Sequence, residues 1–97
     1  NNMLSLDVIN EISENLNRIN SNSLIRFSLR YQDNTIYVYK KNSLITTNYC
    51  RIEYEDDNDY LCVHFYNFEM SQYDPHYIKI RKDTLTTDLE LLLNINK

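Results

Sequence analysis

The chain has 97 residues, a formal net charge of −4 and a sequence pI near 5.0, and it contains no glycine. This length suits one domain, residues 1–97, that buries a core without a metal or a disulfide. Common phosphate-binding loops need glycine, so we expect no nucleotide chemistry and no cofactor. No apolar stretch approaches the roughly 20 residues that span a bilayer, and the N-terminus lacks a signal core. We therefore expect an intracellular protein, cytoplasmic or nuclear, that does not engage membranes.

A helix is predicted over about residues 5–20. Ser5 suits its N-terminal cap, and the polar run 20–23 suits its end. The same spacing fits a short heptad seam, so the stub of a coiled coil is an alternative to a helix that lies on a sheet. The apolar residues recur three and four positions apart, on one side of the helix: Val8, Ile9, Ile12, Leu16 and Ile19.

Two β-hairpins follow, because the apolar period changes from helical to two. Asp and Asn tolerate the left-handed conformation of tight turns better than other non-glycine residues, so Asp33-Asn34 and Asp57-Asn58 are the predicted turns. Two-residue turns define the cross-strand register. The predicted strands are about 24–31 with 36–40 and about 49–55 with 60–68. The predicted pairs are Leu29 with Val38 and Ile52 with Val63 on one face, and Arg30 with Tyr37 and Arg51 with His64 on the other.

The chain ends in a fifth strand and a second helix. A strand is predicted at about 77–81 after Pro75, and helical spacing of leucines predicts a helix over about 85–95. Both helices must cover the apolar side of the sheet, since only that side offers them a hydrophobic surface. The sequence therefore predicts an α+β fold: a two-layer sandwich whose five-stranded antiparallel meander sheet carries the N-terminal and C-terminal helices on one face.

The opposite side of the sheet, here called the outer face, is predicted to be rich in tyrosine and arginine. Its charged residues are basic except for Glu53, although the whole chain is acidic. Tyrosine and arginine are enriched at protein interfaces, so we expect this face to bind another protein. The alternative is that the two residue types pair across strands and only solvate the sheet. The residues predicted to bind the partner are Arg30, Tyr37, Tyr39, Tyr49, Arg51, Tyr66 and Arg81.

Two other partners fit the outer face. The first is single-stranded nucleic acid, because proteins bind it with aromatic rings that stack on the bases and arginines that hold the phosphates. Binding of single-stranded nucleic acid is therefore the alternative function. The low pI argues against this alternative, because an acidic protein repels a polyanion. A second copy of the chain, which would make a homodimer, is the other alternative.

The cysteines are not expected to be catalytic. Cys50 and Cys62 are predicted on opposite faces of the sheet, so a disulfide would need wrongly paired strands. Cys62 and His64 could pair as nucleophile and base, with Glu53 opposite, but neither an oxyanion hole nor a glycine-built elbow accompanies them. No catalytic residue is assigned, and the protein is not expected to be an enzyme. No metal site is assigned, because the spacing of the donor residues matches no zinc pattern. Those donors are Cys62, His64, Asp74 and His76.

Clustered carboxylates at the second turn form a secondary candidate contact. A solvated turn is the simplest explanation, and the functional alternative is mimicry, in which spaced carboxylates occupy a phosphate-binding groove of a partner. Abundant Asn, Ile and Tyr beside absent Gly and Ala indicate an AT-rich genome, such as that of a low-GC bacterium, its phages or a large virus. A small phage or viral inhibitor of a host protein would use the acidic contact at the second turn. The residues of this acidic contact are Glu55, Asp56, Asp57 and Asp59.

The order helix, antiparallel meander, helix is similar to that of RWD-like domains, which serve as docking modules and often follow coiled coils. Tyr73-Asp74-Pro75 departs from the Tyr-Pro-containing signature of that family. The resemblance is architectural, and it implies a docking role. Together these observations predict a non-enzymatic protein-protein interaction domain, either a docking module of a larger complex or a small antagonist.

Overall fold

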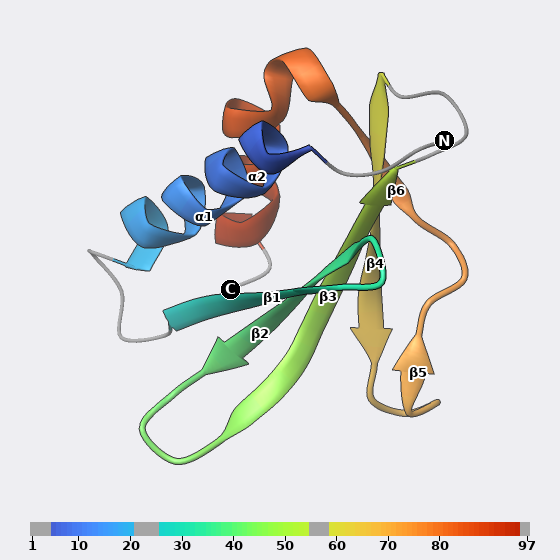
Figure 1. Cartoon of the computed structure of the whole chain (residues 1–97). Helices are drawn as coiled ribbons and strands as arrows, with labels where there is room; N and C mark the ends of the chain where they lie inside the picture. Colours follow the sequence, from blue (N-terminus) through green and yellow to red (C-terminus); the bar gives the residue numbers. More distant parts are fainter. Residues whose placement is uncertain (1–4, 21–25, 55–58, 96–97) are drawn as a thin grey trace.

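The computed structural model describes residues 5–20, 26–54 and 59–95, and it has the two predicted layers (Figure 1). Helix α1 (Leu6–Asn20) precedes four strands, β1 (Arg26–Gln32), β2 (Thr35–Lys41), β3 (Thr46–Tyr54) and β4 (Tyr60–Asn67). Two short strands, β5 (Gln72–Tyr73) and β6 (Ile78–Arg81), lead through a 3-10 turn (Lys82–Thr84) into helix α2 (Leu85–Ile95). The predicted α+β class is confirmed. Neither α1 nor α2 is long and apolar enough to cross a membrane.

The sheet is an antiparallel meander whose last position is shared by two strands. Strands β1 to β4 lie side by side in chain order. Along the other edge of β4, β5 pairs with one end through Tyr66 and Tyr73, and β6 pairs with the other end through Tyr60 and Arg81. The strand predicted at 77–81 is therefore β6. Strand β5 was not predicted, because two residues are too short to show an alternating pattern.

The register of both hairpins is the predicted one. Asp33 and Asn34 have φ angles of 52° and 60°, the left-handed pair of a type I′ turn that usually recruits glycine. Ser71 in the turn before β5 also has a positive φ, 52°. The second predicted turn, Asp57-Asn58, lies outside the described residues, as do the strand ends predicted at 24–25 and 55.

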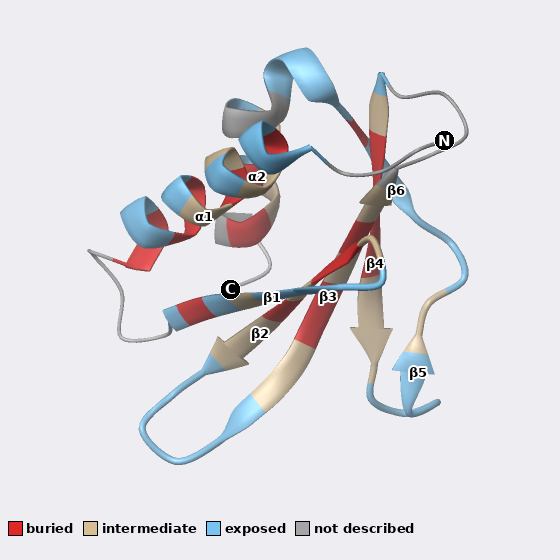
Figure 2. Cartoon of the chain, viewed as in Figure 1, coloured by how far each residue is buried: buried red, intermediate tan, exposed pale blue. Residues whose placement is uncertain are grey.

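The core lies between the two helices and one face of the sheet. Helix α1 contacts β1 and α2, and α2 contacts β6. Figure 2 shows the buried residues on the helix sides turned toward the sheet and on the strands facing them. Full burial of one such side chain contributes about 1.5–3 kcal/mol, so these residues hold the layers together. The largest apolar side chains that are fully buried are Ile12, Ile36, Ile52, Leu61, Leu89 and Leu93.

Strand β3 contains a β-bulge that the sequence pattern did not reveal. Val38 of β2 pairs with Cys50, but the next residue, Tyr39, pairs with Asn48, so Tyr49 is an additional residue in β3. A bulge places two residues of one strand opposite one residue of its partner and breaks the strict alternation of faces. The residues from Cys50 to Tyr54 keep their predicted faces, whereas Tyr49 and the residues before it in β3 do not follow the predicted alternation.

Candidate functional site

A continuous series of aromatic and guanidinium groups crosses the outer face of the sheet. The guanidinium carbon of Arg30 lies 5.2 Å from the ring centroid of Tyr37. The ring of Tyr37 lies 6.0 Å from that of Tyr73, and the guanidinium carbon of Arg51 lies 5.4 Å from the Tyr73 centroid. The series thus joins β1, β2, β3 and β5.

Two further rings extend this series toward the β4–β5 turn. Tyr66 packs edge-on against Tyr73, with centroids 5.1 Å apart, and Phe68 packs edge-on against Tyr66 at the same distance. Phe68 is 62% exposed, although large apolar side chains are usually covered. We call the whole set the Tyr/Arg band, and its members are Arg30, Tyr37, Arg51, Tyr66, Phe68 and Tyr73.

Tyr73 lies in the middle of the band and is held in its neutral form. Its surroundings raise the pKa of Tyr73 to about 12. Burial of the phenol is the largest cause, the nearby hydroxyls of Tyr39 and Tyr37 add to it, and Arg51 opposes it. The hydroxyl of Tyr73 therefore keeps its proton at neutral pH.

Arg51 has hydrogen-bonding capacity that the described residues do not use. Its Nη2 lies 3.9 Å from Oε1 of Glu53, a long ion pair, and its side chain is 32% exposed. Its Nε is buried and has no hydrogen-bond partner among the described residues. A buried donor without an acceptor costs about 1–3 kcal/mol, and a molecule on the outer face would meet the exposed part of the Arg51 side chain and not this nitrogen.

The prediction that Tyr49 lies on the outer face is wrong. Its side chain is 8% exposed and belongs to the hydrophobic core. The Tyr49 ring packs against Phe27 and Phe65, with centroids 5.0 Å and 5.5 Å apart, and the amine of Lys40 lies over it. The β-bulge is the physical reason, because the additional residue turns Tyr49 toward the helices. Tyr49 cannot contact a partner that binds the outer face.

The structure places Tyr39 and Tyr66 on the outer face, as predicted, both half-buried. It adds Tyr73 and Phe68, which the sequence analysis missed. Tyr73 belongs to a two-residue strand beyond a turn, so alternation could not assign it to a face. The available signal was a second tyrosine, seven positions after Tyr66, across the turn that ends at Ser71.

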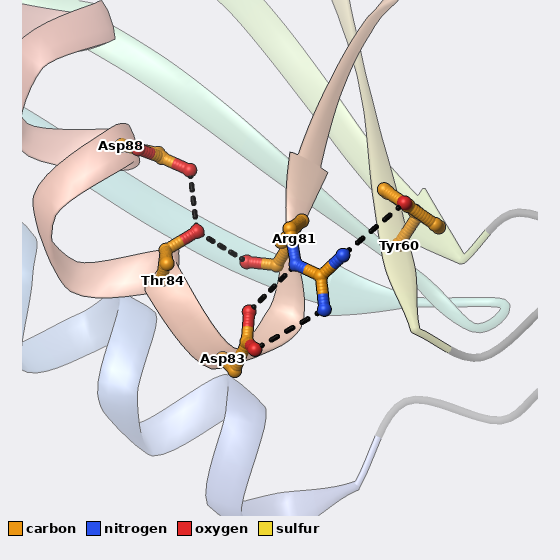
Figure 3. A network of polar contacts seen from close by, with 5 residues as sticks. All are labelled: Tyr60, Arg81, Asp83, Thr84 and Asp88. Carbon is orange, nitrogen blue, oxygen red and sulfur yellow. Dashed lines mark hydrogen bonds and ion pairs between the residues drawn. The ribbon is translucent and has the colours of Figure 1, made fainter.

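Arg81 lies at the edge of the outer face, away from the Tyr/Arg band, and already has partners (Figure 3). Its Nε donates to Oδ1 of Asp83 at 3.0 Å and its Nη2 donates to Oδ2 at 3.2 Å, while Nη1 donates to the hydroxyl of Tyr60 at 3.4 Å. The hydrogen bond from Arg81 lowers the pKa of Asp83. Arg81 is exposed, but its charge is neutralised by this carboxylate.

His64 and Cys62 point to the outer face but are covered there. Nδ1 of His64 lies 2.8 Å from the carbonyl oxygen of Asp74, which only accepts, so this nitrogen carries a proton. Nε2 lies 3.4 Å from Oε1 of Glu53, and the ring of Tyr77 stacks on the imidazole with centroids 5.2 Å apart. These contacts give His64 a structural role, which is to hold the segment between β5 and β6.

Both cysteines are free and buried. Burial raises the pKa of the Cys50 thiol, so this sulfur is protonated and unreactive. Within the described part of the chain, no three His, Cys, Asp or Glu side chains gather into a group that could hold a metal ion.

Most of the acidic-turn contact lies outside the described residues, which omit Glu55, Asp56 and Asp57. Asp59 is described and exposed, and its carbonyl oxygen accepts a hydrogen bond from the backbone N–H of Lys82 at 2.8 Å. That bond ties the start of β4 to the end of β6.

No family model, curated protein or solved structure matches this chain. The architectural resemblance to RWD-like domains is therefore not supported by a structural match.

Proposed function

We propose that this chain is a non-enzymatic protein-protein interaction domain that binds its partner protein through the Tyr/Arg band. The observation that carries the proposal is the partly exposed guanidinium group of Arg51, which lies over the ring of Tyr73 in a series of half-buried tyrosines. Aromatic and arginine anchors of this kind account for most of the binding energy at protein interfaces.

The internal contacts of the band favour protein recognition because they fix its side chains before binding. The guanidinium groups of Arg30 and Arg51 lie over the rings of Tyr37 and Tyr73. Side chains that are ordered in the free protein lose less entropy on association, which raises affinity for a rigid complementary surface.

Ring geometry disfavours the alternative function, single-stranded nucleic-acid binding. Base stacking needs flat, accessible ring faces. The ring planes of Tyr66 and Tyr73 are at 83° to each other, those of Tyr37 and Tyr73 are at 55°, and guanidinium groups lie over two of the faces. This arrangement suits a contoured protein surface better than a row of bases.

Two settings are compatible with the proposal: a larger complex of the same cell, and a host protein antagonised by a phage or virus. In the second setting the acidic turn would contribute contacts. The free thiols of Cys50 and Cys62 support an intracellular setting, since disulfides persist mainly in oxidising compartments.

Affinity capture with a matched pair of variants tests the proposal. The wild-type chain and the Tyr37→Ala, Arg51→Ala double variant are used as baits in lysate of the producing cell or its host, with and without nuclease. A Tyr31→Ala, Lys82→Ala double variant is the control, because it removes one tyrosine and one positive charge away from the band. A captured protein is then purified and titrated against each bait by calorimetry.

We expect one protein that binds wild type and control equally, ignores nuclease, and binds the band variant at least about tenfold more weakly, as removal of anchors does. Nucleic acid in the eluate, with affinity that falls steeply as salt is added, would instead establish the nucleic-acid function. Equal binding by the band variant and wild type would mean that the band only solvates the sheet. Self-association of the purified chain that the band variant abolishes would identify a homodimer interface.

A further inference from the structure

Two cations lie directly opposite each other at the open end of the β1–β2 ladder. Arg26 of β1 pairs with Lys41 of β2, and both side chains are exposed. Like charges placed opposite each other on one face of an antiparallel pair destabilise the ladder. Such a pair is therefore a local disadvantage for the free protein unless an anion neutralises it.

The described residues do not supply that anion. No carboxylate among them lies within ion-pair distance of Arg26 or Lys41. Between Asn15 and Asn48 the sequence holds a single acidic residue, Asp33, which belongs to the turn at the far end of the same hairpin. The positive charge at this end of the sheet is uncompensated by its neighbours in sequence, including residues 21–25.

A cavity is present where the two cations lie. Its volume is about 380 Å³, which is the size of a small-ligand site. Besides the two cations it is lined by Ser28, Asn42 and Ser43, together with Phe27. Hydroxyl and amide groups donate hydrogen bonds to anionic oxygens, so the lining complements a carboxylate or phosphate in charge and in hydrogen bonding.

We propose that this cavity, the Arg26–Lys41 site, binds a carboxylate side chain of the partner protein. The inference rests on the proposed docking function and adds the chemistry of the partner, which is acidic where it meets β1 and β2. The site continues the outer face, since Arg26, Ser28 and Lys41 lie on the same side of the ladder as Arg30 and Tyr37. A partner surface that spans both would place an acidic residue in the cavity and apolar or aromatic residues on the Tyr/Arg band.

A carboxylate is favoured over a nucleic-acid phosphate by the overall charge. A nucleic acid brings a row of phosphates past the whole protein, whose net charge is −4, and binding it depends on many cationic contacts. A single acidic side chain needs only the local pair. The Arg26–Lys41 site offers two cations close together and is therefore matched to one anionic group.

Titration with small charged probes tests the site without the partner. Acetyl-tetraglutamate amide is added to the full chain at low salt, and backbone amide shifts are followed by two-dimensional NMR. Acetyl-tetraglutamine amide is the neutral control, and pentathymidylate carries an equal charge on phosphates. The wild type is compared with Lys41→Gln and with Lys82→Gln, which makes the same change of net charge at the other end of the molecule.

We expect tetraglutamate to shift the amides of Ser28, Asn42 and Ser43, and Lys41→Gln to weaken this binding by about three- to tenfold while Lys82→Gln has little effect. We also expect Lys41→Gln to raise the melting temperature of the free chain, because it removes the like-charge pair. Equal weakening by both variants, or no localised shifts, would overturn the proposal. Tighter binding of pentathymidylate at the same residues would replace it with a phosphate site. The tetraglutamate titration tests the Arg26–Lys41 site and the capture experiment tests the docking function. Localised tetraglutamate binding therefore supports the site even if the capture experiment finds no partner protein, and the two failures can be distinguished.

Discussion

The side-chain amide of Asn20 pairs with the backbone of Phe27 as another strand would. Nδ2 of Asn20 donates to the carbonyl oxygen of Phe27 at 2.7 Å, and the N–H of Phe27 donates to Oδ1 of Asn20 at 2.6 Å. Both backbone groups point away from β2, on the open edge of β1. The last residue of α1 therefore anchors the helix to the sheet and satisfies two buried polar groups at once.

Replacing Asn20 with Ala should destabilise the protein by about 1–3 kcal/mol, because two buried backbone groups lose their partners. The measurement is urea unfolding followed by circular dichroism. Asn17→Ala, on the exposed side of the same helix, is the control and should be close to neutral. A stability unchanged by Asn20→Ala would show that water replaces the amide without loss.

Asn15→Ala should change the free energy of unfolding in the opposite direction and stabilise the protein. Asn15 lies in the same helix and is 0% exposed, but neither end of its amide has a hydrogen-bond partner among the described residues. Removing it abolishes a desolvation cost and introduces the best helix former, so we expect a gain of up to about 1 kcal/mol in the same urea experiment. A clear loss would mean that the amide has a partner, for example a buried water.

Tyr49 offers a test of the β-bulge. Its hydroxyl is buried without a partner among the described residues, so Tyr49→Phe should be neutral or stabilising, whereas Tyr49→Ala should cost about 3–5 kcal/mol through the cavity it leaves. Tyr37→Ala on the outer face should cost less than about 1 kcal/mol. If Tyr37→Ala were as damaging as Tyr49→Ala, the assignment of the two faces would be wrong.

Alkaline titration should reveal the raised pKa of Tyr73. Its pKa is raised from 10.0 to about 12 in the folded protein, so folding favours the protonated phenol. That stabilisation is complete below the unfolded value and is lost as the pH rises from 10.0 toward about 12. Urea unfolding across this range should show a shallower decline for Tyr73→Phe than for the wild type. Parallel declines for the two proteins would contradict the raised pKa.

The two thiols should not react with thiol reagents in the native state. Cys50 is fully buried and Cys62 is 4% exposed, so neither should react with a thiol reagent until denaturant is added, when both should react. The measurement is the absorbance of released thionitrobenzoate over time. Rapid reaction of Cys62 in the native protein would reopen the question of a Cys62–His64 nucleophile.

The sequence pattern was sufficient for the layers, the hairpins and most of the outer face. Alternating residues around Asp33-Asn34 defined the register that pairs Arg30 with Tyr37, because a tight turn leaves little freedom. The pattern failed at Tyr49, where a bulge interrupts the alternation without glycine or any other local mark. It also failed at Tyr73, because a two-residue strand is specified by its contacts with Tyr66 and not by its own sequence.

The Arg26–Lys41 site shows a second limit of sequence reasoning. Arg26 lies within the strand predicted at 24–31, but Lys41 lies one residue beyond the strand predicted at 36–40, so their pairing could not be foreseen. Only the full length of β2 brings the two cations opposite each other.

The sharing of one β4 edge by β5 and β6 has a consequence for how the protein behaves at high concentration. Between the two short strands, the N–H of Asp74 donates to the carbonyl oxygen of Phe65 at 2.8 Å, so that edge of β4 is occupied along its length. At the other edge of the sheet, Asn20 occupies the backbone groups of Phe27 near the start of β1. Short or blocked edges are poor templates for the addition of further strands, which is how β-sheet proteins avoid fibril formation. The partners of the β4 edge, and not the tyrosines of the outer face, therefore limit the addition of further strands on that side of the sheet.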